Sequence, residues 1–97
     1  MIEIVRTADS LSVKGHANYA EPGKDIVCAA VSALTQTLIQ SIEELTDDTI
    51  QYDIQPGTVN IKFWCLSDLA RGLVDAFFVG IRMIADEYPD NVKLTKH

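Results

Sequence analysis

Residues 15–32 read GHANYAEPGKDIVCAAVS and bring a histidine and a cysteine together across a loop that opens a helix. His16 follows an alternating segment, and residues 18–24 have the proline and glycine content of a loop. Asp25 precedes a strongly apolar run, where its carboxylate can accept N–H groups of the first helical turn and complement the helix dipole. Cys28 then falls at the third helical position. The backbone N–H groups and the field at a helix start favour a thiolate there, which is the nucleophilic form of the side chain.

This pairing indicates acyl-transfer chemistry. Proteolysis by a cysteine requires a thiolate, a histidine to carry protons and donors for the oxyanion that forms on the attacked carbonyl. We assign Cys28 as the nucleophile and His16 as general base and then general acid, with the first-turn N–H groups as oxyanion donors. The competing interpretation is that Cys28 is a small buried apolar residue and His16 a hydrogen-bonded structural one. On physical grounds alone the two interpretations carry about equal weight.

Two residues of the helix start have both a structural and a functional interpretation. Asp25 either caps the helix or orients His16 as the third member of a triad, and the two roles are compatible. Ser32 lies one helical turn after Cys28 on the same face, so its hydroxyl reaches either the site or the carbonyl of Cys28.

The loop between the pair is expected to take part in binding. Residues 17–23 are predicted to close over a substrate, with Tyr19 as an aromatic wall and Gly23 as a hinge, although an ordinary exposed connection has the same composition. Gly15 allows the chain to bend out of the preceding strand.

Length and charge limit the class of protein. The 97 residues predict one domain, 1–97, at a size where a second copy often adds needed burial, so a homodimer is expected. A net charge of −6 disfavours nucleic-acid binding and suits a basic protein partner. There is no uninterrupted apolar run of membrane-spanning length and no signal-like segment, so we expect a cytoplasmic protein without a membrane contact.

Neither cysteine suggests a disulfide framework or a metal site. The chain has two cysteines, Cys28 and Cys65, and they lack the paired short spacings of structural zinc ligands. We expect no metal and no cofactor. Cys65 follows Trp64 at the end of a predicted strand and is expected to be buried.

The rest of the chain reads as an α+β domain of order ββαββαβ, with two helices on a mainly antiparallel sheet. Its predicted helices have apolar stripes that run to Leu45 and start at Leu69, and a smooth face (Gly72, Ala76, Gly80) predicts close approach to the alanine-rich side of the first helix. The predicted elements span residues 2–6, 10–14, 26–45, 50–54, 59–63, 68–88 and 92–95.

Two motifs of the sequence resemble those of the ribosomal-processing cysteine proteases (Prp), a family of small bacterial enzymes. One is Gly15-His16-Ala17 followed, across the loop, by Asp25-Ile26-Val27-Cys28-Ala29-Ala30-Val31-Ser32. The other is the less specific segment YPDNV at residues 88–92. Chain length and element order match as well, so the resemblance covers essentially the whole chain.

The resemblance implies a thiol protease of ribosome biogenesis that removes the N-terminal extension of large-subunit ribosomal protein L-twenty-seven. It implies a cut just after an aromatic pair, so an apolar groove is expected near Cys28. It also adds Asp25 and Ser32 to the site, because both belong to the family motif. Two other functions remain open: a non-catalytic acidic module that binds a ribosomal protein, and a hydrolase of other acyl substrates.

Overall fold

The structure, a computed structural model, describes residues 1–96. Its elements have the predicted order ββαββαβ, and their bounds agree with the predicted ones to within one residue at most ends. The elements are β1 (Ile2–Arg6), β2 (Ser10–Lys14), α1 (Ile26–Leu45), β3 (Ile50–Gln55), β4 (Thr58–Phe63), α2 (Asp68–Glu87) and β5 (Val92–Lys96).

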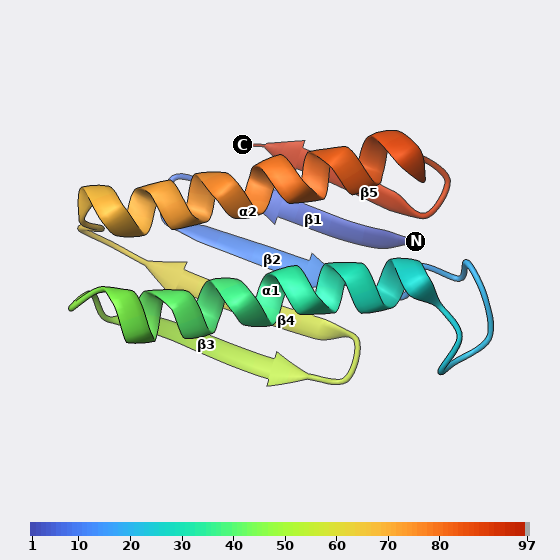
Figure 1. The fold of residues 1–97 in the computed structure, drawn as a ribbon, viewed down its shortest axis with the longest axis horizontal. Coiled ribbons are helices and arrows are strands. Elements are labelled where there is room, and N and C mark those ends of the chain that lie inside the picture. The colour runs from blue at the N-terminus through green and yellow to red at the C-terminus, as the bar shows by residue number, and fades with distance from the viewer. Residues whose placement is uncertain (97) are drawn as a thin grey trace.

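The strands form one mixed sheet in the order β3-β4-β2-β1-β5 (Figure 1). Three neighbouring pairs are antiparallel, and only β1 and β5 are parallel, with Ile2 opposite Val92. The parallel pair is possible because α2 carries the chain back along the sheet between β4 and β5. The prediction of an α+β fold with a mainly antiparallel sheet is therefore confirmed.

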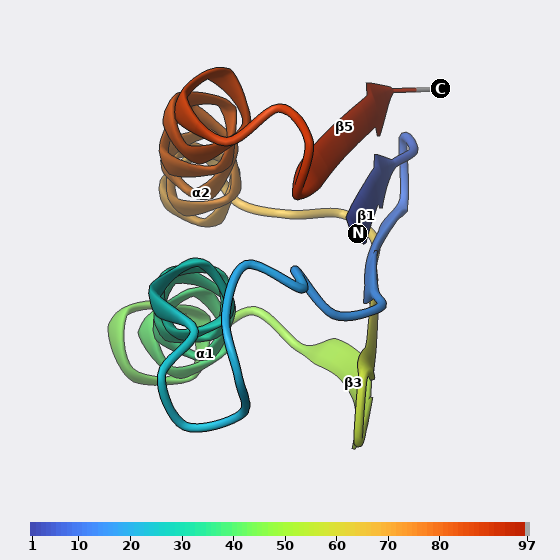
Figure 2. The same ribbon diagram turned by 90° about the vertical axis from the view of Figure 1, so that its right-hand side faces the viewer.

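Both helices lie on the same face of the sheet, so the domain has two layers (Figure 2). In both views α2 runs beside β1 and β5, and α1 runs beside β4 and β3. The core lies between the layers and includes Ile4, Leu11, Ile42, Ile61 and Ile81, each at most 1% exposed. Strand alternation explains this set, since one face of β1, β2 and β4 is apolar.

The residues predicted for the two helical stripes are buried in the core or packed against it, except Leu45 and Leu69. Leu45 and Leu69 are 60% and 54% exposed, because Leu45 is the last residue of α1 and Leu69 lies on the outer side of α2. By length and composition α1 could cross a membrane, although Ser32, Thr35 and Gln36 interrupt its apolar residues. In the structure, however, Val27, Val31 and Ile42 of this helix are buried in the core.

The two helices approach each other closely at one glycine of the predicted smooth face. A Cβ built on Gly80 would lie 2.9 Å from Leu34 Cδ1 of α1, whereas a Cβ on Gly72 would meet nothing within 4 Å. The prediction of close approach is therefore confirmed at Gly80, against a leucine rather than an alanine. It is wrong at Gly72, which faces open space.

These glycines give a matched pair of variants. Gly72→Ala should raise the free energy of unfolding by about 0.5–1 kcal/mol, because alanine removes the entropic cost of glycine in a helix. Gly80→Ala should lose that gain or destabilise, because Leu34 must move. Chemical denaturation of both variants measures the difference, and an equal gain in both would contradict the packing described.

Helix α1 begins at the predicted cap. One oxygen of Asp25 accepts N–H groups from Val27 and Cys28, both at 3.0 Å. The other oxygen accepts N–H groups from Tyr19 at 3.0 Å and Ala20 at 3.3 Å, both in the loop before the helix. One carboxylate thus starts the helix and ties the loop to it.

The pH dependence of stability should reveal this carboxylate. The Cys28 N–H, followed by the other N–H groups, holds the pKa of Asp25 below its usual value of 3.8 in the folded protein. Its stabilising effect is therefore complete above that value and is lost as the pH falls through the lower folded-state pKa. Asp25→Ala should melt at a lower temperature than the wild type at neutral pH, and the gap should close in acid.

Asp25→Asn is the matched control, since asparagine still caps a helix but carries no charge. It should fall between the two in thermal unfolding followed by circular dichroism. A gap between wild type and Asp25→Ala that stays constant with pH would contradict a role for the charge.

Candidate active site

Three connections gather at the end of the molecule where β2 stops: the loop before α1, the β3–β4 turn and the turn between α2 and β5 (Figure 1). Gly15 begins the loop with φ 99°, and its N–H donates to the carbonyl of Gly57 at 2.8 Å. A side chain at Gly15 would overlap the carbonyl oxygen of Met1. The predicted bend at Gly15 is confirmed, and it directs the next residue, His16, out of the sheet.

The imidazole of His16 lies against the β3–β4 turn. A Cβ built on Gly57 would lie 3.1 Å from His16 Nε2 and 3.4 Å from its Cε1. Gly57 also has φ 73°, a conformation that favours glycine. From sequence this glycine lay only between two predicted strands, 50–54 and 59–63, and its contact with His16 was missed because nothing local predicts it.

Cys28 is half-buried in the first turn of α1. Its Sγ accepts the backbone N–H of Ala17 at 3.3 Å. Ala17 is only 1% exposed although it belongs to the loop, and the side chain of Asn91 donates to its carbonyl at 2.9 Å. The sulfur therefore has a fixed hydrogen-bond donor in the loop that precedes the helix.

Two hollows meet at this pair of residues. One has a volume of about 280 Å³ and extends along α1 beside β3 and β4; the other has about 620 Å³ and lies beneath the loop. His16, Cys28 and Ser32 line both. The first hollow has the apolar lining that was expected near Cys28, with side chains from the sheet and from α1 that include Val31, Ile39, Ile54 and Val59.

The structure separates the two interpretations of Asp25. All four hydrogen bonds to its carboxylate come from backbone N–H groups, and none within residues 1–96 comes from His16. The helix cap is confirmed. The hydrogen bond to His16 that a triad member would make is absent from the described residues 1–96. Ser32 is exposed and lines both hollows. Within residues 1–96 its hydroxyl makes no hydrogen bond to Cys28.

The first-turn N–H groups are less available than expected. Those of Val27 and Cys28 donate to the Asp25 carboxylate, and that of Ala29 donates to the Asp25 carbonyl at 3.1 Å. These three N–H groups are not free for an oxyanion in this arrangement, because Asp25 accepts all of them.

The loop residues lie in two environments. The ring of Tyr19 packs edge-on against Tyr88, with centroids 5.2 Å apart, and lines neither hollow beside Cys28. The predicted aromatic wall is therefore directed at the α2–β5 turn. Gly23 lines the larger hollow with φ 85° and open space around it, which is compatible with a hinge.

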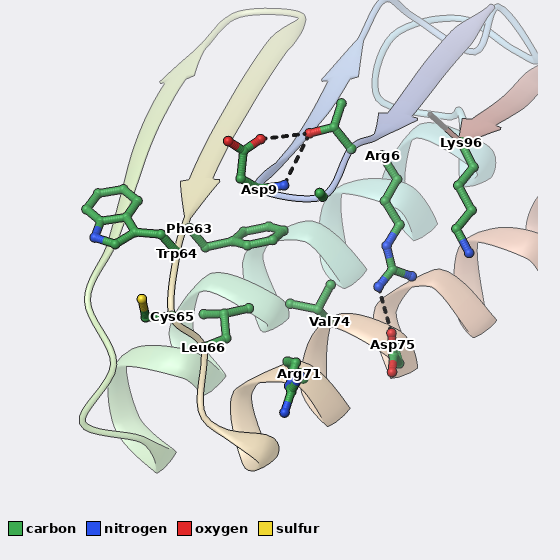
Figure 3. Close-up of a pocket in the computed structure, with 12 residues that line it drawn as sticks. Arg6, Asp9, Phe63, Trp64, Cys65, Leu66, Arg71, Val74, Asp75 and Lys96 are labelled. Carbon is green, nitrogen blue, oxygen red and sulfur yellow. Dashed lines mark hydrogen bonds and ion pairs between the residues drawn. The ribbon is translucent and has the colours of Figure 1, made fainter.

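A separate hollow of about 660 Å³ lies at the opposite end of the sheet (Figure 3). It is formed by the β1–β2 turn, the segment after β4 and the first turns of α2. Cys65 lines it and is exposed, so the expectation that this thiol is buried is wrong. The chain leaves the sheet at Phe63, and Cys65 adopts φ 53° in the connection to α2, where no strand covers it.

The site thus brings together a half-buried thiol with a backbone donor and an imidazole on the same two hollows. A chain bound through both hollows would cross the sulfur. This arrangement suits attack on a carbonyl within an extended polypeptide, with proton transfer by the imidazole.

Comparisons with known proteins agree with this chemistry. The family model "Cysteine protease Prp" matches residues 1–93. Ribosomal processing cysteine protease Prp of Staphylococcus aureus is 34% identical over 83 residues, which cover 82% of this chain and 78% of that protein. The protein of the same name from Mycoplasma genitalium is 31% identical over 99% of this chain and 96% of its own length.

Solved structures agree over the whole chain. The S. aureus Prp protease with a covalently linked product peptide has a TM-score of 0.96 and 26% identity, and both chains are covered completely. The same protease with a substrate peptide has a TM-score of 0.89 and 25% identity, again with full coverage. With the family model spanning residues 1–93, these matches establish that the chain belongs to the Prp family of cysteine proteases.

Proposed function

We propose that this protease removes the N-terminal extension of large-subunit ribosomal protein L-twenty-seven, with Cys28 as nucleophile and His16 as general base. The observation that carries the proposal is the position of Cys28, in the first turn of α1 where two hollows meet beside His16. The relatives named as ribosomal processing proteases support the class of substrate.

The reaction follows from these two side chains. His16 takes the thiol proton as Sγ of Cys28 bonds to the scissile carbonyl carbon and the carbonyl oxygen becomes an oxyanion. Collapse of this intermediate breaks the C–N bond, and His16 returns the proton to the departing amine. A water molecule then gives a proton to His16 and attacks the thioester carbonyl carbon. The C–S bond breaks, His16 returns that proton to the sulfur, and the new carboxylic acid loses its own proton to solvent.

The smaller hollow suits the residues before the cut. Its apolar side chains come from α1 and from β3–β4, and Ile54 is 55% exposed although it lies in a strand. An exposed isoleucine at the wall of a groove gains burial when an aromatic side chain binds, at roughly 25 cal/mol per Å² of apolar surface. This supports recognition of an aromatic pair on that side.

Charge supports a basic substrate. The chain carries a net charge of −6, with 14 acidic against 8 basic side chains. Such a surface attracts a basic ribosomal protein over a screening length of about 8 Å at physiological salt. This attraction raises the rate of encounter, whereas the groove selects the scissile bond.

The central experiment is cleavage of a peptide that spans the N-terminal extension, followed by mass spectrometry. Wild-type protein should make a single cut after the aromatic pair. Cys28→Ser should lose at least about 10³-fold in rate, because the hydroxyl is a much weaker nucleophile here. Cys65→Ser, the matched control at the opposite end of the sheet, should cut at the wild-type rate.

A peptide with both aromatic residues replaced by alanine tests the groove and should be cut much more slowly by the wild type. Binding of the intact peptide by folded wild-type protein, with no cut, would instead favour the non-catalytic binding module. Equal loss in Cys28→Ser and Cys65→Ser would contradict the assignment of the nucleophile.

We also infer that the protein forms a homodimer through the outer face of α2. Leu69, Val79 and Met83 are 54%, 45% and 66% exposed, and their spacing puts them on one side of the helix. Gly72 and Ala76 continue this stripe without a charge. A second copy that packs there would bury it.

Sedimentation equilibrium tests the dimer. Wild-type protein should sediment as twice the monomer mass of 10.7 kDa, and Met83→Glu should shift it to the monomer. Lys93→Glu on β5 introduces a carboxylate away from the stripe and should remain dimeric. A monomeric wild type, or a dimer that tolerates Met83→Glu, would contradict this interface.

A further inference from the structure

The segment YPDNV, residues 88–92, lies in the turn between α2 and β5 and is not explained by the reaction described above. In the structure this turn touches the start of the catalytic loop at two points. Asn91 Nδ2 donates to the carbonyl of Ala17 at 2.9 Å, and the Tyr88 ring packs edge-on against Tyr19. Ala17 and Asn91 are 74 positions apart in the sequence.

Asn91 is itself held from two sides. Its N–H donates to the carbonyl of Tyr88, the cap of α2, at 3.0 Å, and its carbonyl accepts the N–H of Ile2 at 2.8 Å. The first contact fixes Asn91 to the end of α2, and the second fixes it to the start of β1. Its side chain therefore projects from a rigid turn rather than from a mobile one.

The other side of Ala17 faces the nucleophile. Its N–H donates to Cys28 Sγ at 3.3 Å, and the residue is almost fully buried. The carbonyl bonded to Asn91 and the N–H bonded to the sulfur belong to one residue, so fixing the first limits the direction of the second. A hydrogen bond to the sulfur holds the sulfur in one direction for attack.

We propose that Asn91 is a positioning residue of the protease: it holds Ala17 so that the Ala17 N–H stays directed at the Cys28 sulfur. Asn91 touches neither the sulfur nor the two hollows and acts only through Ala17. The inference deepens the proposed function and rests on Cys28 as its nucleophile. It gives the Tyr88–Val92 turn a part in catalysis, although the turn lies far from the cysteine in sequence.

The test is Asn91→Asp, which keeps the size of the side chain but replaces the N–H donor by an oxygen that repels the Ala17 carbonyl. We expect kcat on the extension peptide to fall about 10- to 100-fold with little change in KM, since a small displacement of a reacting group has effects of this size. The time profile of Cys28 alkylation by iodoacetamide at neutral pH, resolved by mass spectrometry, should slow. Cys65 serves as the internal reference.

Gln51→Glu is the matched control for the added charge. It makes the same amide-to-carboxylate change at an exposed position of β3, opposite Lys62, and should leave kcat and the alkylation profile unchanged. Asn91→Ala adds no charge and should lower kcat and slow Cys28 alkylation by less than Asn91→Asp does. It replaces Asn91→Asp as the test if the aspartate variant does not fold.

Two results would overturn the proposal. One is a folded Asn91 variant with unchanged kcat and an unchanged Cys28 profile. The other is a variant that loses thermal stability while Cys28 alkylates as in the wild type, since that outcome belongs to a purely structural turn. Alkylation needs no peptide, so the role of Asn91 is decided even if the extension peptide proves not to be the substrate.

Discussion

The acceptance of four backbone N–H groups by the Asp25 carboxylate is the constraint on which the site depends. One oxygen starts α1, which puts Cys28 in the first turn, and the other folds the preceding loop back over the helix start. The same bonds, that from Cys28 first, lower the pKa of Asp25. They also use the N–H groups of Val27 and Cys28, so oxyanion donors must come from elsewhere or from a rearranged loop.

The sheet brings the remaining parts to the same end of the molecule. The β2 strand ends at Lys14 and delivers His16, and the antiparallel pairing of β2 with β4 sets the β3–β4 turn beside it, where Gly57 leaves room for the imidazole. The parallel pairing of β5 with β1 puts Asn91 at this end as well. Sheet topology thus converts three distant segments into one site.

Much of the fold could be predicted because its signals are local. Alternation marks the strands, Asp25 and Ser67 cap the helices and Pro89 follows the end of α2. The contacts of Gly57 and Asn91 could not be predicted, because they join elements whose relative position depends on the whole sheet. The prediction that Cys65 is buried was wrong for a related reason, because periodicity does not say whether another element covers the residue after a strand.

In the candidate site too, the features with local signals could be predicted and the contacts between distant elements could not. The sequence pattern predicted the pair His16 and Cys28 and the cap, since all three lie within one stretch of chain. The apolar groove was expected only from the resemblance to the family. The sequence left open whether Asp25 also contacts His16, and the structure gives no such hydrogen bond in residues 1–96. Whether Asp25 can contact His16 depends on the path of the loop. The hydrogen bonds of the second Asp25 oxygen and the contacts of Ala17 determine that path.

The central claim is that the environment of Cys28, and not its exposure, makes it the nucleophile. The most direct measurement is the rate of alkylation of each thiol in the unmodified protein near neutral pH, resolved by mass spectrometry. Cys65 is exposed and Cys28 is half-buried, so access alone favours Cys65. Faster alkylation of Cys28 is the predicted result, because its sulfur accepts the Ala17 N–H and shares its two hollows with His16, the base assigned to it. Faster alkylation of Cys65, or equal rates, would contradict the account.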